Sequence, residues 1–121
     1  MKQPQTIKID DVEYVKKDDY EPAEQMNGYD YVIVRGENSG VFAGYLEERK
    51  GREVKILNAR RIWYWDGASS LSQLAVDGTS KPENCKFPCT VGRIQVLDAI
   101  EILNCSECAR LSIKNVKIWK E

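Results

Sequence analysis

Short β-prone runs separated by glycine-containing turns are the feature that most limits the folds open to this sequence. From Tyr31 the chain alternates runs rich in valine, isoleucine and aromatic residues with segments such as 36–40 and 49–52, which are typical of tight turns. These patterns predict strands at 6–15, 31–35, 41–48, 53–57, 60–65, 90–102 and 116–119. The range 90–102 is long enough for one bent strand or for two strands.

Two short helices are expected between these strands. Ser70 and Gln73 have the spacing of an N-terminal capping box, and Gly78 suits the cap at the other end of that helix. Ser106 can cap a second helix that runs through Lys114. Strands outnumber helices without regular alternation, so the sequence predicts an α+β fold, with an antiparallel or mixed β-sheet and two short helices.

The bulk composition limits the number of domains and the classes of partner. A length of 121 residues fits a single domain over 1–121, with 1–28 as a less regular N-terminal segment. The 18 Lys and Arg residues nearly balance 19 Asp and Glu residues, which argues against binding a nucleic acid polymer. No apolar run could cross a bilayer and the N-terminus is polar, so we expect a cytoplasmic protein with no membrane partner.

The sequence contains no histidine. Its absence removes the commonest general base and every Ser–His or Cys–His nucleophile that the chain could otherwise form by itself. We therefore expect a protein that is not an enzyme and needs no cofactor.

The cysteines approximate a structural zinc pattern. They are Cys85, Cys89, Cys105 and Cys108. The first pair is separated by three residues instead of two, and a chain of this length can fold without a metal. We expect no metal ligands and interpret these residues as small buried thiols, with a zinc-stabilised adaptor domain as an alternative.

Arginines, aromatic rings and small polar residues are concentrated in the segment 58–73. On a strand, Arg60 and Arg61 would point to opposite faces, each beside aromatic rings. A guanidinium can hold a phosphate through two hydrogen bonds, and a flat ring can stack on a base. The segment ends at the helix expected after Ser70, whose free N–H groups could bind an anion. This combination suits a ligand that carries both phosphate and base.

The candidate ligand-binding residues come from this segment and three others. Arg60 and Arg61 are the candidates for phosphate. The candidates for stacking or for the walls of a site are Phe42, Trp63, Tyr64, Trp65 and Phe87. The candidates for polar contacts are Asn58, Ser69, Ser70, Asn84 and Arg110. A core of packed rings with solvated arginines would explain the same pattern, and both interpretations stay open at this point.

A family resemblance adds to these patterns. The stretches YVIVRGENSGVFAGYLEERKGREV at 31–54, NARRIWYWDGASSLSQLAVDG at 58–78 and PENCKF at 82–87 resemble the first type of Thoeris anti-defence proteins of bacteriophages. The similarity runs from about Tyr31 to Trp119, which is most of the chain.

The resemblance implies a protein that captures a cyclic ADP-ribose signal, glycocyclic ADP-ribose, made by host TIR enzymes in the infected bacterium. The signal would be held intact, so that the downstream effector is not triggered. The resemblance also implies a homo-oligomer, a dimer or a hexamer, and in some members a second site for other cyclic oligonucleotides. A nucleotide phosphodiesterase acting on the same signal is the alternative, and carboxylates or cysteines would have to supply its chemistry.

Overall fold

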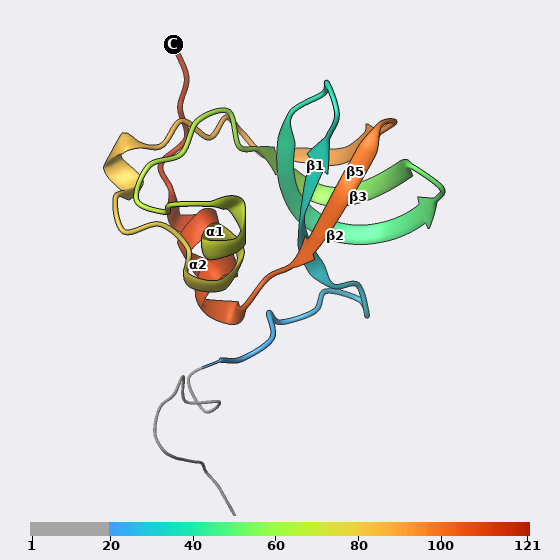
Figure 1. The fold of residues 1–121 in the computed structure, drawn as a ribbon, viewed down its shortest axis with the longest axis horizontal. Coiled ribbons are helices and arrows are strands. Elements are labelled where there is room, and N and C mark those ends of the chain that lie inside the picture. Colours follow the sequence, from blue (N-terminus) through green and yellow to red (C-terminus); the bar gives the residue numbers. More distant parts are fainter. Residues whose placement is uncertain (1–19) are drawn as a thin grey trace, which may run out of the picture.

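The computed structural model of the chain describes residues 20–121, which form one five-stranded antiparallel sheet with two α-helices against it (Figure 1). The strands, in the spatial order β4-β3-β2-β1-β5, are β1 (Tyr31–Gly36), β2 (Val41–Lys50), β3 (Glu53–Arg61), β4 (Val91–Val96) and β5 (Ala99–Asn104). The helices are α1 (Leu71–Asp77), α2 (Glu107–Asn115) and the short 3-10 helix η2 (Pro82–Asn84). The expected α+β class is confirmed, and the sheet is antiparallel throughout.

Two of the expected strands are wrong. The range 60–65 is not a separate strand, because β3 runs on to Arg61 and the next residues leave the sheet. The N–H groups of Trp63 and Tyr64 donate to the carbonyl of Lys86, at 3.2 and 3.3 Å, instead of to β2. The range 116–119 forms only an isolated bridge between Ile118 and Phe87. The strand expected at 6–15 lies outside the described residues.

Both helices begin where the sequence predicts. Ser70 accepts a hydrogen bond from the backbone N–H of Gln73 (3.1 Å), and Ser106 caps α2 in the same way through Ala109 (3.0 Å). The return bond of the first cap goes from the N–H of Ser69 to the Gln73 side chain (2.7 Å), one residue away from a standard capping box. Among residues 20–121, no helix is long and apolar enough to cross a membrane.

The sheet has a buried cluster on each face. Tyr31 and Ile33 point toward the helices and pack with residues of α1 and α2, whereas Val32 and Val34 belong to the cluster on the other face. This division follows from the period of two along a strand. The sheet also curls, since the N–H of Ala99 in β5 donates to the carbonyl of Arg52 in the β2–β3 turn (3.0 Å). The helices therefore cover one face of a curved sheet (Figure 1).

A β-bulge in β3 decides which side chains face the helices. Tyr45 pairs with Leu57 and Ala43 pairs with Arg60, so β3 has one more residue than β2 between these pairs. Asn58 takes the left-handed conformation (φ 49°) at this point. On β2 the opposing residue is Gly44, where an added Cβ would lie 2.8 Å from the carbonyl oxygen of Leu57. The extra residue reverses the alternation of β3 and turns Arg60 toward the helix layer.

Candidate functional site

A cavity of about 260 Å³ lies between the sheet and α2, and it brings together three of the predicted ligand-binding residues, Asn58, Arg60 and Arg110. The sheet also contributes Tyr31 and Tyr45 to its lining. In addition to Arg110, α2 contributes Lys114 to the lining, and two loops contribute Met26 and Thr90. The exposed side chains of Asn58, Thr90 and Lys114 place the mouth of the cavity at the solvent side.

Backbone carbonyls hold Arg60 in place. Its guanidinium donates to the carbonyls of Ile113 (2.8 Å) and Val116 (2.9 Å) at the end of α2. It also donates to the carbonyls of Phe87 (2.8 Å) and Pro88 (3.0 Å). A guanidinium has five N–H groups, so these contacts leave one for a ligand. Burial lowers the pKa of Arg60 below its ordinary value. Arg60 therefore stabilises the floor of the cavity and adds positive charge to it.

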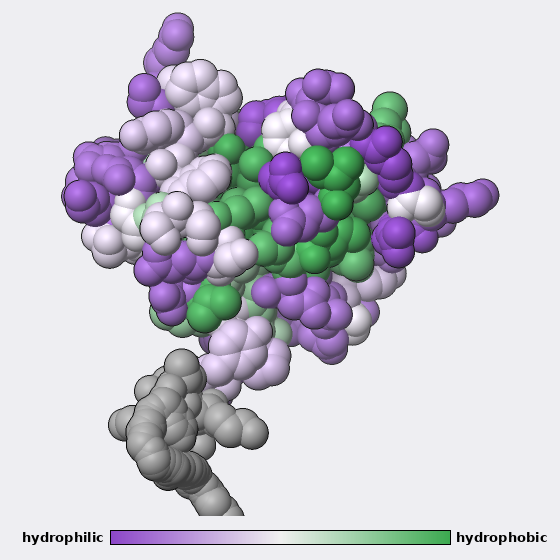
Figure 2. All heavy atoms as spheres, viewed as in Figure 1, coloured by the Kyte–Doolittle hydropathy of each residue, from purple (hydrophilic) through white to green (hydrophobic). Residues whose placement is uncertain are grey.

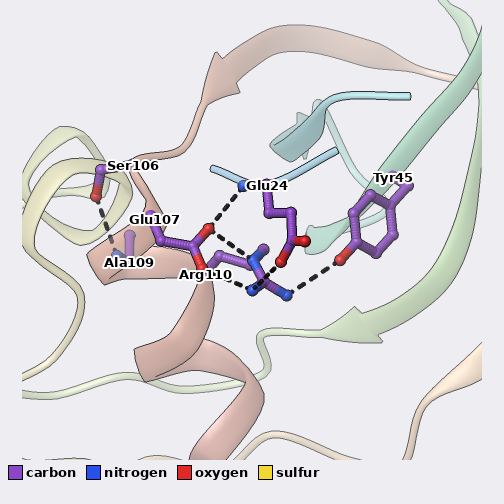
Figure 3. A network of polar contacts seen from close by, with 6 residues as sticks. All are labelled: Glu24, Tyr45, Ser106, Glu107, Ala109 and Arg110. Atoms are coloured by element: carbon purple, nitrogen blue, oxygen red, sulfur yellow. Dashed lines mark hydrogen bonds and ion pairs between the residues drawn. The ribbon is translucent and has the colours of Figure 1, made fainter. Parts of the chain in front are cut away.

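A carboxylate fixes the second arginine. Arg110 makes two hydrogen bonds to Glu107 (3.0 and 2.7 Å), one to the hydroxyl of Tyr45 (3.3 Å) and one to Glu24 (3.3 Å), as Figure 3 shows. The side chain of Arg110 is only 9% exposed. The hydrogen bond to Arg110 lowers the pKa of Glu107 to about 2, helped by the backbone N–H of Glu24 (2.6 Å). This network fixes one wall of the cavity at neutral pH.

Two other predicted residues, Trp63 and Tyr64, lie outside the cavity, on what we call the aromatic shelf, which they form with Trp119 around Lys86. The rings of Trp63 and Trp119 stack at 5.1 Å with 20° between their planes. The ammonium group of Lys86 lies 5.5, 6.0 and 5.7 Å from the rings of Trp63, Tyr64 and Trp119. All three rings are between 43% and 58% exposed. Only Trp63 and Tyr64 had been predicted.

The other aromatic candidates are packing residues. Phe42 and Phe87 are almost fully buried, at 2% and 0% exposure. Each lies under an arginine, with Arg61 4.5 Å from the Phe42 ring and Arg60 5.4 Å from the Phe87 ring. Trp65 packs against the core on the helix side. Arg61 is on the opposite face from Arg60, as expected for neighbours on a strand, and donates to the carbonyl of Ser39 (2.8 Å).

Internal partners occupy the polar groups around the start of α1. Ser69 bonds to Gln73 through both its N–H and its hydroxyl, and Ser70 caps the helix. Asn84 donates to the carboxylate of Asp66 (2.9 Å), and this bond is the main cause that lowers the pKa of Asp66. The side chains of Ser69, Ser70 and Asn84, which we expected to contact a ligand, are therefore bonded within the protein.

The cysteines do not gather into a metal site. Within residues 20–121, no group of three or more Cys, Asp or Glu side chains could hold a metal ion. Cys85 and Cys105 are buried, whereas Cys89 and Cys108 are exposed. The thiol of Cys85 lies near the carbonyl of Asp66 (3.6 Å), and that of Cys108 near the carbonyl of Asp77 (3.5 Å). The interpretation as buried thiols therefore holds for Cys85 and Cys105 and is wrong for Cys89 and Cys108, and the zinc-stabilised alternative has no ligand geometry in this part of the chain.

The cavity also contains residues that the sequence patterns did not single out. Tyr31 and Tyr45 are partners across β1 and β2, with ring centroids 5.0 Å apart. Their proximity depends on strand pairing, which no local pattern records. Lys114 could have been found, because it lies one helical turn after Arg110 and such residues share a helix face.

The fold and the cavity define an α+β domain with a cationic, tyrosine-lined site between an antiparallel sheet and a helix. A family described as a domain of unknown function, DUF6948, matches residues 29–113. The chain belongs to this family, since the match spans more than half of its length and includes every strand and both helices except the end of α2. No curated protein and no solved structure matches the chain. The resemblance to Thoeris anti-defence proteins therefore stays a prediction.

Proposed function

We propose that this protein binds a small anionic nucleotide signal and keeps it without turning it over. The observation that carries this proposal is the cavity in which Arg60, Arg110 and Lys114 lie beside two tyrosine rings. The cations suit a phosphate group, and the rings suit the flat or apolar part of the same ligand. Together with the sequence resemblance, these features support glycocyclic ADP-ribose as the ligand and an anti-defence role in the cytoplasm of the infected host.

Sequestration requires tight binding, and the fixed arginines favour it. Carbonyls and carboxylates of the protein itself hold Arg60 and Arg110, so little side-chain entropy is lost when a ligand binds. Lys114 is exposed at the mouth of the cavity and can move to meet the ligand. In the proposed complex, Arg110 and Lys114 therefore contact the pyrophosphate, while Arg60 contributes mainly through its charge.

The test is a release experiment. Purified protein is mixed with glycocyclic ADP-ribose, the free signal is measured after filtration, and the retained fraction is then heated to denature the protein. We expect the free signal to disappear on mixing and to return chemically unchanged after heating. A cleaved product in the released fraction would contradict the proposal and favour the phosphodiesterase alternative.

Two matched variants connect the result to the cavity. Lys114→Gln removes a charge at the mouth and leaves the core untouched, so it should weaken the affinity about tenfold, typical of one charged hydrogen bond. Trp63→Ala changes the aromatic shelf and should leave the affinity within about twofold. Equal losses in both variants would place the ligand elsewhere.

Assembly with further copies is part of the proposal. On the face shown in Figure 2, apolar side chains gather over the sheet and hydrophilic ones surround them. In the β4–β5 hairpin, Leu97 is 66% exposed and Ile100 is 46% exposed. Exposed apolar side chains of this kind fit contact with a second copy, as the resemblance to dimeric or hexameric proteins implies. Light scattering of the wild type and of Leu97→Lys should show a larger wild-type particle.

A further inference from the structure

One polar group in the cavity has no role in the fold described so far. Tyr31 lies on β1 beneath α2, its side chain lines the cavity, and the residue is only 6% exposed. Within residues 20–121 its hydroxyl forms no hydrogen bond, whereas the hydroxyl of its neighbour Tyr45 is bonded to Arg110 (3.3 Å). Buried hydroxyl groups are nearly always bonded, because leaving one without a partner costs free energy.

The surroundings of Tyr31 determine what that partner can be. Burial is the main cause that raises the pKa of Tyr31 above its ordinary value, and the nearby Arg60 and Arg110 charges only partly oppose it. The hydroxyl therefore stays protonated at physiological pH and can donate. Both guanidinium groups line the same cavity as Tyr31, so a group that accepts its hydrogen bond there shares the cavity with Arg60 and with Arg110, whose charge is paired with Glu107 and Glu24.

The lining as a whole offers donors. Arg110, Lys114 and the last free N–H of Arg60 can only donate, and Asn58 can donate through its amide. A ligand group with several acceptor oxygens and negative charge matches this set, and a phosphate ester is the group that provides both. The cavity volume of about 260 Å³ is just below the range of ligand pockets, about 300–1,000 Å³, so the cavity can take part of a ligand such as ADP-ribose and not the whole of it.

We propose that the cavity takes the phosphate-bearing part of the ligand and that the Tyr31 hydroxyl donates a hydrogen bond to a phosphate oxygen there. This inference rests on the proposed function, because it assigns a ligand group to the same cavity. It goes further by naming a residue that determines specificity and by stating that phosphate is required. Ligands with the base and ribose alone bind weakly or not at all.

The test is isothermal titration of three proteins with three probes. The proteins are the wild type, Tyr31→Phe and Tyr64→Phe, where the last removes an exposed hydroxyl of the aromatic shelf. The probes are ADP-ribose, inorganic pyrophosphate and adenosine. We expect the wild type to bind both phosphate compounds and not adenosine. Tyr31→Phe should weaken ADP-ribose binding at least about tenfold, and Tyr64→Phe should change it less than about twofold.

Thermal melting without ligand separates a ligand contact from a structural role. Removing a hydroxyl that has no partner should leave the melting temperature of Tyr31→Phe equal to that of the wild type or raise it. A lower melting temperature would mean that the hydroxyl is bonded within the protein, and the inference would be wrong.

The remaining outcomes distinguish this inference from the proposed function. Unchanged affinity of Tyr31→Phe, or adenosine binding as tightly as ADP-ribose, would overturn the inference while nucleotide binding stands. If the wild type binds neither phosphate probe but captures the cyclic signal in the release experiment, the proposed function is supported and the phosphate assignment is wrong. If the wild type binds none of these ligands, the proposed function and the phosphate assignment are both wrong.

Discussion

The cavity beneath α2 and the aromatic shelf around Lys86 both combine cations with aromatic rings, and they differ in how the cation is held. In the cavity, Arg60 and Arg110 are buried and bonded to carbonyl and carboxylate oxygens. On the shelf, Lys86 is exposed and lies over rings that are themselves half exposed. Fixed charges in a site with little water interact more strongly with an anion than mobile charges in water do. The comparison therefore favours the cavity as the ligand site, although the shelf contains more aromatic surface.

Neighbouring arginines show the same contrast at the level of single residues. Arg60 makes four hydrogen bonds to backbone carbonyls, whereas the exposed Arg61 makes one, to Ser39, and covers the Phe42 ring. Strand alternation puts the two side chains on opposite faces, and the bulge at Asn58 decides that Arg60 is the one that faces the helices. The predictions below test this division, from the largest expected effect to the smallest.

Arg60→Met should be the most damaging of these substitutions. It removes a buried charge, leaves the carbonyls of Pro88 and Val116 without their donor and takes one of two donors from those of Phe87 and Ile113, so we expect a loss of about 3–5 kcal/mol in the free energy of unfolding. Arg61→Met is the matched control and should cost less than about 1.5 kcal/mol. Urea denaturation measures both, and similar losses would contradict the contrast between the two arginines.

Gly44→Ala tests the bulge that turns Arg60 toward the helices. The new Cβ would lie 2.8 Å from the Leu57 carbonyl oxygen, so β2 and β3 would have to move apart, at a cost of about 1–3 kcal/mol. Gly92→Ala in β4 is the control, because an added Cβ there meets nothing within 4 Å. We expect this control to be neutral or to gain up to about 1 kcal/mol. ADP-ribose affinity should fall only in Gly44→Ala.

Trp63→Ala tests whether the shelf matters to stability. The stacked ring is 58% exposed, so its loss should cost only about 1 kcal/mol. A double-mutant cycle with Trp119→Ala should give a coupling energy of about 0.5–1.5 kcal/mol in urea denaturation. A coupling near zero would mean that the two rings do not stack in solution.

Glu107→Gln should produce the smallest effect, a change in pH dependence. The folded-state pKa of Glu107 is depressed from 4.5 to about 2, so its stabilising contribution is complete above pH 4.5 and is lost as the pH falls toward 2. The difference in free energy of unfolding between wild type and variant should therefore shrink over that range. Equilibrium denaturation at several pH values measures it. A difference that is constant with pH would show that the Glu107–Arg110 contact does not set this pKa.

Local signals in the sequence predicted much of the fold. Ser70, Gly78 and Ser106 marked the helix ends correctly because caps depend on residues within one turn. The range 60–65 was wrong because its β-prone residues pair with Lys86, a partner that local propensity cannot identify. The predicted site residues lie in two separate places for the same reason. Arg60 and Trp63 are close in the sequence, but Arg60 lines the cavity and Trp63 lies on the aromatic shelf. No local pattern identified Tyr31 as a site residue, because its place there depends on the pairing of β1 with β2, which puts it beside Tyr45.

Arg60 also links pieces of chain that are far apart in the sequence. Its guanidinium joins β3 to Phe87 and to the end of α2, over separations of 27, 53 and 56 residues. Such a cross-link merges distant segments into one cooperative unit, so their amide protons exchange with solvent through a shared opening event. Partial fraying of α2 is therefore not enough to remove the floor of the cavity, which stays in place until this shared opening occurs.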